Sequence, residues 1–246
     1  DEENNLINAN KLQKAGCYVI YGIGALKIHT KLLLIVKKDK NKVKNYAHLG
    51  TGNYNETTSK FYSDISLMTS KKKYTRDALE FFNVITGHSL PDEYENLITA
   101  PVRMRKKILE LINIEKENSR NGLKSGIVIK INSLQDKRVI NALYDASACG
   151  VKIKLVVRGI CCLRPGRKNL SENISVISIV GDFLEHSRIY YFHNNNDPVL
   201  YSGSADIMIR SFDRRIESLF RINDNILKKE LISIIYNTLK DNYNSY

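Results

Sequence analysis

The sequence predicts a mixed α/β fold made of two halves related by a pseudo-two-fold axis. With 43% apolar residues among 246, the chain can bury a sizeable core. Helix and strand patterns alternate through its second half, which is typical of sheets flanked by helices. In addition, one short motif centred on a histidine occurs twice, which predicts the pseudo-symmetry.

The first half is expected to contain two helices and four strands. Apolar residues recur at helical spacing within residues 1–16, which predicts the first helix. The other elements are expected as strands over 17–21, 31–38, 43–49 and 61–68 and a helix over 77–86. The 31–38 run is almost continuously apolar, which favours a strand buried within a sheet. Two of the four prolines lie within residues 89–101, so the boundary is placed there, giving domains 1–96 and 97–246.

The second half is expected to alternate helices and strands. It opens with a long helix over 103–120, which Asn121-Gly122 closes. The elements after it are expected as strands over 126–131, 151–157, 174–179, 187–193, 198–202 and 216–222 and helices over 136–149 and 225–240. This alternation favours mixed sheets with helices on their faces.

The chain is strongly basic. Lysine and arginine outnumber aspartate and glutamate by 38 to 26, a formal net charge of +12. The excess predicts a polyanionic partner such as nucleic acid, polyphosphate, a nucleotide or anionic lipid, although lysines at an expected hairpin tip supply part of it. The four cysteines show neither metal-ligand spacing nor a disulfide framework, which indicates reduced intracellular thiols. No apolar run reaches the ~18 residues of a membrane helix, and a start at Asp1 inside a helix predicts a fragment of a longer protein.

A histidine motif occurs twice along the chain. Each copy consists of His-x-(Lys/Arg), a β-rich stretch and a turn of small residues that ends in Asn or Asp. The first copy contains His29, Lys31 and Asn53, and the second contains His186, Arg188 and Asp206. A histidine and a cation two residues later point to one face of a strand, which pairs a candidate nucleophile with a phosphate ligand. Two copies predict a site at the seam between the halves, where one histidine attacks and the other handles the proton.

The two turns, 50–53 and 202–206, are rich in small residues that let backbone N–H groups approach an anion closely. Together with the histidine motifs, they place Asn53 among the candidate phosphate-binding residues. The alternative is that the turns are only turns and that Lys31 and Arg188 are exposed charges beside the strands.

A carboxylate follows each turn by 11 residues, Asp64 in the first copy and Glu217 in the second. A catalytic imidazole needs a partner for its second nitrogen, which fixes its tautomer and orientation. We therefore predict crossed pairs, in which Glu217 orients His29 and Asp64 orients His186. The alternatives are pairing within each half, or carboxylates that only form structural salt bridges with nearby cations.

Residues 157–167 form an arginine-rich segment directly after a strand that is expected to be buried. Arg158 and Arg164 would lie at the carboxyl end of that strand, where α/β folds bind ligands. Because arginine holds phosphate bidentately, both are candidate phosphate ligands. The alternative is a solvated basic loop.

Long stretches of the chain resemble the C-terminal part of bacterial polyphosphate kinases. The matching stretches are 27–31, 48–54, 61–64, 158–166, 171–173, 180–181, 183–188, 204–206 and 213–215. The strings RGICCLRPG and FLEHSR are long and specific, and the resemblance spans nearly the whole chain. It covers only about the last third of the family's length.

The resemblance implies two phospholipase D-like halves with mixed sheets. It makes His29 the phosphorylated histidine and His186 an assisting residue that contacts ATP, with further nucleotide contacts at Tyr62 and Arg158. It also implies Mg2+ as a cofactor, but the family's magnesium-binding arginines correspond to positions before Asp1, so no metal ligand is expected in this chain. The Asp that follows His-x-Lys in phospholipase D is replaced here by apolar or aromatic residues, which fits the kinase branch better than a phosphodiesterase.

The resulting hypothesis is a catalytic fragment of an enzyme that reversibly transfers the γ-phosphate of ATP to the end of inorganic polyphosphate through a phosphohistidine. Lys31, Arg188, Arg158 and Arg164 would neutralise the phosphates. The alternatives are a phospholipase D-like phosphodiesterase or nuclease, and a non-catalytic polyanion-binding module. The expected partners are ATP, ADP and polyphosphate rather than nucleic acid. The full-length protein is expected to be a cytoplasmic homo-oligomer that can associate peripherally with a membrane.

Overall fold

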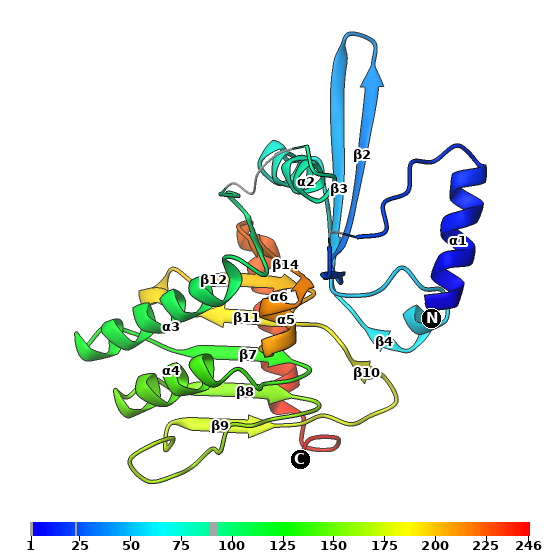
Figure 1. The fold of residues 1–246 in the computed structure, drawn as a ribbon. Coiled ribbons are helices and arrows are strands. Elements are labelled where there is room, and N and C mark those ends of the chain that lie inside the picture. The colour runs from blue at the N-terminus through cyan, green and yellow to red at the C-terminus, as the bar shows by residue number, and fades with distance from the viewer. Residues whose placement is uncertain (1, 23, 89–92) are drawn as a thin grey trace.

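The computed structural model describes residues 2–22, 24–88 and 93–246, and its largest layer is a seven-stranded sheet in the second half (Figure 1). The strand order is β6-β14-β12-β11-β7-β8-β9. The strands are β6 (Leu97–Thr99), β7 (Ile127–Ile131), β8 (Ile153–Val157), β9 (Ile174–Ile177), β11 (Ile189–Phe192), β12 (Val199–Gly203) and β14 (Ser218–Ile222). The β7-β8-β9 neighbours are parallel and the others antiparallel, so the predicted mixed α/β class is confirmed.

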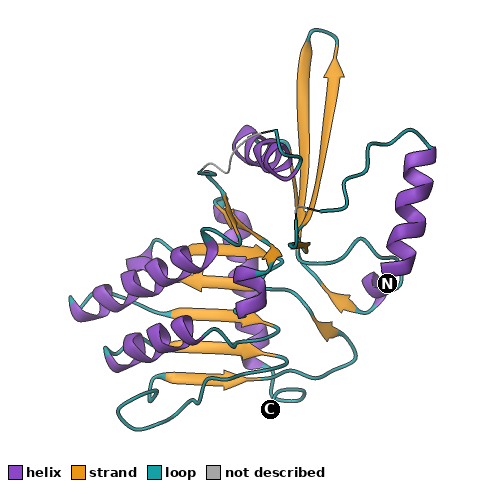
Figure 2. Ribbon diagram, viewed as in Figure 1, coloured by secondary structure: helices purple, strands orange, loops and turns teal. Residues whose placement is uncertain are grey.

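Helices cover both faces of this sheet (Figure 2). Helices α3 (Met104–Arg120) and α4 (Lys137–Ala148) pack in one hydrophobic core with Leu219 of β14. Helix α6 (Asn225–Lys240) packs in a second core with Phe220, the next residue of the same strand. Because successive side chains of a strand point to opposite faces, the two cores lie on opposite sides of the sheet.

The first half contributes a smaller, antiparallel sheet. Strands β2 (Lys31–Asp39) and β3 (Lys42–Gly50) form a long hairpin, and β5 (Ser66–Thr69) pairs only with the last four residues of β3. Beyond β5 the hairpin projects from the body as a two-stranded ribbon (Figure 1). Helices α1 (Glu2–Lys14) and α2 (Lys72–Ile85) complete this half.

Two sequence predictions in the first half are wrong. Strand β2 exists, but it is not buried, since Ile35 and Val36 are 52% and 56% exposed. The reason is that β2 is an edge strand and that its outer part is paired only with β3. Residues 17–21 form no strand, and Tyr18 is 88% exposed. Apolar and β-branched residues form a strand only where a partner strand is available.

Most other predicted elements are confirmed, with shifted ends. Helix α2 begins five residues earlier than predicted, and the strands expected over 61–68 and 216–222 are each interrupted by a break. Some elements were not predicted from the sequence: strands β6, β1 (Lys27–Ile28) and β10 (Leu184–Glu185), and the short elements η1 (Thr58–Lys60), η2 (Asn194–Asn196) and α5 (Ile209–Asp213). Residues 89–92, where the expected boundary segment begins, lie outside the described residues. Among the described residues, no helix combines the length and apolar character needed to cross a bilayer.

Two short parallel strand pairs join the halves to each other. Strand β1 (Lys27–Ile28) of the first half pairs with β13 (Arg215–Ile216) of the second. Reciprocally, β10 (Leu184–Glu185) of the second half pairs with β4 (Tyr62–Ser63) of the first. This exchange gives the seam the pseudo-two-fold relation that the repeated motif predicts, although the two sheets differ in size.

Candidate functional site: two histidine–carboxylate pairs at the seam

His29 and Glu217 face each other where β1 and β13 end. The strand register pairs Ile28 with Ile216, so the next residue of each strand, His29 and Glu217, comes into contact. Nδ1 of His29 lies 2.8 Å from Oε2 of Glu217. The Glu217 side chain is fully buried, whereas 21% of the His29 side chain is exposed. The carboxylate therefore holds the imidazole from the protein interior.

His186 and Asp64 form the reciprocal pair after β10 and β4. The register pairs Glu185 with Ser63, and Nδ1 of His186 lies 2.7 Å from Oδ1 of Asp64. The predicted crossed contacts are thus present, and pairing within each half is excluded for both histidines. The nearest cation to Glu217, Nη1 of Arg215, is 3.9 Å from Oε1, so the imidazole is the closer partner.

The environment keeps both imidazoles neutral near pH 7. Burial lowers the pKa of His29, and the contact with Glu217 opposes this effect without cancelling it. Burial likewise lowers the pKa of His186, with Asp64 opposing and Arg188 adding to the shift. A neutral imidazole that donates its Nδ1 proton to a carboxylate carries its lone pair on Nε2.

The two Nε2 atoms differ in their surroundings. Nη1 of Arg188 lies 3.1 Å from Nε2 of His186. In the described part of the chain, no residue forms a hydrogen bond with Nε2 of His29. His29 is also the more exposed of the two, since only 10% of the His186 side chain is exposed. His29 therefore has the more accessible lone pair.

Lys31 and Arg188 are buried, not exposed as one alternative supposed. Lys31 is 5% exposed, and its Nζ donates to the main-chain oxygen of His29. Burial lowers the pKa of Lys31 to about 8, with Arg188 and Arg215 adding to the shift and Glu217 opposing it. Lys31 is thus a partly desolvated cation beside the imidazole of His29.

Arg188 occupies the equivalent place beside the second imidazole. It is 2% exposed, and its Nη1 donates to the main-chain oxygen of His186 at 2.9 Å. Its Nε and Nη2 donate to the Asp206 carboxylate at 3.3 and 3.2 Å. Arg188, a candidate phosphate ligand, is thus already paired with a carboxylate.

The remaining predicted site residues divide into two groups. The Tyr62 ring lies 4.9 Å from the His186 ring, and the positive charge of Arg158 contributes to the lowered pKa of His186, so both border the second imidazole. Arg164 and Asn53 are exposed, and neither hydrogen-bonds through its side chain to a histidine within the described residues. No side-chain contact therefore joins either residue to the two histidines within the described part of the chain.

Two cations near the histidines, Lys130 and Arg215, were not predicted as site residues. Lys130 of β7 is 2% exposed, and its Nζ lies 2.7 Å from Oγ of Ser187 and 3.0 Å from Oε2 of Glu185. Burial lowers its pKa. A lone lysine within an otherwise apolar strand was the available signal. Arg215, which lowers the pKa of His29, precedes Glu217 by two residues and so matched neither motif.

The side chains at the seam do not form a magnesium site. Within the described residues, no group of three or more His, Cys, Asp or Glu side chains could hold a metal ion. The carboxylates present are already engaged: Asp64 and Glu217 contact imidazoles, and Asp206 contacts Arg188. Cations dominate the remaining surroundings, which suits phosphate groups and not a bare divalent cation.

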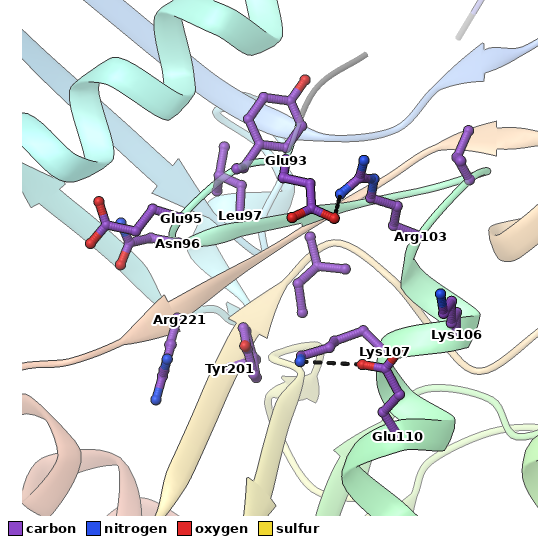
Figure 3. Close-up of a pocket in the computed structure, with 13 residues that line it drawn as sticks. Glu93, Glu95, Asn96, Leu97, Arg103, Lys106, Lys107, Glu110, Tyr201 and Arg221 are labelled. Atoms are coloured by element: carbon purple, nitrogen blue, oxygen red, sulfur yellow. Dashed lines mark hydrogen bonds and ion pairs between the residues drawn. The ribbon is translucent and has the colours of Figure 1, made fainter.

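A separate cavity of about 470 Å³ lies between β6 and α3 (Figure 3). It shares no lining residue with the histidine pairs. Two of its cations are paired, since Arg103 lies 2.5 Å from Glu93 and Lys107 lies 3.3 Å from Glu110. Its lining contains no histidine, whereas the seam holds two, so the seam is the candidate active site.

Comparison with known proteins identifies the family of the chain. Family models match residues 1–91 as "Polyphosphate kinase C-terminal domain 1" and residues 97–246 as "Polyphosphate kinase C-terminal domain 2". Polyphosphate kinases from Staphylococcus saprophyticus and Thermosynechococcus vestitus are 48% and 47% identical over 98% of this chain, which covers 34% and 33% of their lengths. The crystal structure of polyphosphate kinase from Porphyromonas gingivalis superposes with a TM-score of 0.91 at 38% identity, over 98% of this chain and 37% of that one. The chain spans about one third of its relatives' length, and it belongs to the polyphosphate kinase family.

Proposed function

We propose that the protein containing this chain reversibly transfers the γ-phosphate of ATP to the end of inorganic polyphosphate, with His29 as the nucleophile. The observation that carries the proposal is the seam itself, where two imidazoles are each held through Nδ1 by a carboxylate from the other half. The name of its relatives, "Polyphosphate kinase", supports polyphosphate as a substrate, and they share nearly half of its residues.

In the first step, Nε2 of His29 attacks the γ-phosphorus of ATP. An N–P bond forms while the bond between the γ-phosphorus and the β,γ-bridging oxygen breaks, and ADP leaves with the electron pair of that bond. Glu217 stabilises the positive charge that develops on the imidazole, because Nδ1–H remains hydrogen-bonded to an ionised carboxylate.

In the second step, a terminal oxygen of polyphosphate attacks the phosphorus on His29. The N–P bond breaks, its electron pair returns to Nε2, and the polyphosphate chain is one phosphate longer. His186, the assisting histidine, lies beside Tyr62 and near Arg158, so we assign it to contact with the phosphates and to proton handling. Both steps run backwards when ADP and polyphosphate are in excess.

The charge of the transferred phosphoryl group requires nearby cations in both steps. Lys31 and Arg215 border His29, and Arg188 and Arg158 border His186. Their partial burial strengthens their interaction with phosphate oxygens, because the local dielectric is low. Arg164 and Asn53 remain candidate contacts for more distant phosphates.

We propose that Mg2+ accompanies the nucleotide and is held by its phosphate oxygens, because the side chains of the seam do not fit a metal site. The full-length protein is further proposed to be a cytoplasmic homo-oligomer. The net charge of +12 supports a weak, salt-sensitive association with anionic membranes, which vesicle flotation at two salt concentrations would measure.

The test uses the full-length protein, ATP labelled at the γ-phosphate, and Mg2+. Acid-labile label should appear on the parent protein and be absent from His29→Ala. His88→Ala is the control, since His88 is exposed and, among the described residues, its side chain hydrogen-bonds only to Thr86. Label that persists in His29→Ala, or that disappears only in His186→Ala, contradicts the assignment.

The alternatives predict different results in the same system. A phospholipase D-like phosphodiesterase or nuclease would hydrolyse a diester without ATP. A polyanion-binding module would bind polyphosphate in a salt-sensitive manner and form no phosphohistidine.

A further inference from the structure

Two buried hydroxyl groups occupy equivalent places behind the two carboxylates. Thr51 directly follows β3 and precedes Asp64 by 13 residues, and Ser204 directly follows β12 and precedes Glu217 by 13 residues. Both residues are completely inaccessible to solvent. Neither was predicted as a site residue, although each lies in one of the two small-residue turns.

Each hydroxyl donates to the same carboxylate oxygen that contacts the imidazole. Oγ1 of Thr51 lies 2.5 Å from Oδ1 of Asp64, the oxygen that contacts His186. Oγ of Ser204 lies 2.5 Å from Oε2 of Glu217, the oxygen that contacts His29. In both copies, therefore, one carboxylate oxygen accepts from a hydroxyl on one side and from Nδ1 of the imidazole on the other.

The hydroxyl proton is directed to the carboxylate in both copies. The N–H of Ile65 donates to Oγ1 of Thr51 at 3.0 Å, and the N–H of Ser218 donates to Oγ of Ser204 at 3.1 Å. A hydroxyl has one proton to donate, and the carboxylate is its closest acceptor in both copies: for Ser204, Oε2 of Glu217 at 2.5 Å is much closer than the main-chain oxygen of Ser218 at 3.4 Å. The turns are held in place by the reverse bonds, N–H of Thr51 to Ile65 O and N–H of Ser204 to Ser218 O, each 3.0 Å.

The glycines beside the hydroxyl residues allow this close approach. A Cβ added to Gly52 would lie 2.4 Å from Oδ2 of Asp64, and one added to Gly203 would lie 2.1 Å from the main-chain oxygen of Ser218. Both distances are far below van der Waals contact, so any larger residue would displace the carboxylate or the strand that carries it. The small residues of the turns therefore leave room for the carboxylates, in addition to the predicted role of these turns in binding an anion.

From this geometry we infer that Ser204 and Thr51 are positioning residues that fix the tautomers of His29 and His186 through Glu217 and Asp64. A hydroxyl and an Nδ1–H that both donate to one carboxylate oxygen favour the ionised carboxylate, because the charged form accepts these bonds more strongly. The proton then stays on Nδ1, and Nε2 keeps the lone pair that attack on phosphorus requires. The Thr51 hydroxyl accordingly contributes to lowering the pKa of Asp64, although burial opposes it.

The kinetic part of the test rests on the proposed function. In the full-length protein, Ser204→Ala should slow phosphohistidine formation by roughly 10–100-fold, the usual effect of removing an outer hydrogen-bond partner, with little change in KM for ATP. Ser204→Thr restores the hydroxyl and should recover the rate. An unchanged rate in Ser204→Ala would overturn the inference, because the hydroxyl would then have no role in the reaction. A rate reduced as much in Ser204→Thr as in Ser204→Ala would also overturn it, because a loss that the restored hydroxyl does not recover indicates a packing role.

Nitrogen NMR of the histidine side chains gives a readout that does not depend on transfer. The parent protein should show both seam histidines protonated on Nδ1, and Ser204→Ala should show a mixed tautomer for His29 alone. If no phosphohistidine forms in the parent, the proposed function fails, yet this spectrum still decides the inference. If Ser204→Ala does not fold, the isosteric Thr51→Val and the matched Thr51→Ser test the second copy, where a mixed tautomer of His186 is expected only in Thr51→Val. A mixed tautomer in the parent itself contradicts the inference.

Discussion

Glu217 and His29 are 188 residues apart in the chain, and yet an oxygen of one lies 2.8 Å from a nitrogen of the other. They meet because β1 and β13, the short strands that precede them, pair in parallel across the seam. The contact defines which nitrogen of His29 is free to react.

Replacing Glu217 with Gln should lower the rate of phosphohistidine formation by roughly 10²–10⁴-fold, the range for a misplaced catalytic proton. An amide cannot stabilise the imidazolium that develops during attack, and it can present an N–H to Nδ1, which favours the wrong tautomer. Single-turnover labelling measures the rate. Glu230→Gln, at an exposed position of α6, is the control, and equal rates in the two variants would contradict the role of Glu217.

The pH dependence of kcat/KM should be bell-shaped. His29 must be neutral to attack, and since its pKa is lowered, activity should rise with pH through a midpoint below 6.5. Lys31 must be charged to neutralise phosphate, and since its pKa is about 8, activity should fall as pH rises through that value. A plateau that extends beyond pH 10 would show that Lys31 does not contribute as a charge.

Replacing Lys31 with Met should separate stability from activity. Because the pKa of Lys31 falls from 10.5 to about 8 on folding, the unfolded chain binds more protons between these values, and stability rises with pH across that window. Keeping the buried lysine charged at pH 7 costs about 3 kcal/mol. Lys31→Met should therefore have an equal or higher Tm at pH 7 but transfer phosphate at least ~10-fold more slowly. A large fall in Tm would contradict this account.

Arg158 and Arg164 should differ in their effects on nucleotide binding. Arg158 borders His186, whereas the Arg164 side chain is exposed. Loss of a charge-assisted contact costs roughly 1.5–3 kcal/mol, so Arg158→Ala should weaken ATP binding by about 10–100-fold. Arg164→Ala should have a smaller effect on ATP. Titration calorimetry at low salt measures both, and equal losses would contradict the distinction.

The sequence predicted the chemistry of the seam better than its surroundings. The spacing of Asp64 and Glu217 after the two turns was repeated within the chain, so a symmetric site followed from the pattern alone. Lys130 and Arg215 follow no such repeat. The structure reveals Lys130 by its burial beside Ser187 and Arg215 by its effect on the pKa of His29. Whether Arg188 is free or paired with Asp206 depends on three-dimensional distances, which the spacing of residues along the sequence does not give.

The fold was predictable where local patterns decide it. Helices and central strands have clear periodicity, and most were found in place. The hairpin strand β2 shows the limit, because its apolar run resembles a buried strand while the neighbours that would bury it are missing along its outer part. The two-residue strands β1 and β10 are too short to show a hydrophobic pattern, although their pairing aligns both histidine–carboxylate pairs.

The reciprocal pairing of β1 with β13 and β4 with β10 also constrains how relatives can recombine. In a chimera that takes residues 1–96 from one enzyme and 97–246 from another, each parent supplies one histidine and the carboxylate for the other parent's histidine. Such a hybrid keeps both histidine–carboxylate pairs only if β1 pairs with β13, and β4 with β10, in the same register as in the parents. A slip of one residue turns a side chain to the opposite face of its strand, so it would disconnect an imidazole without removing a single catalytic residue. An active seam therefore requires compatible strand pairing between the two halves as well as the catalytic side chains themselves.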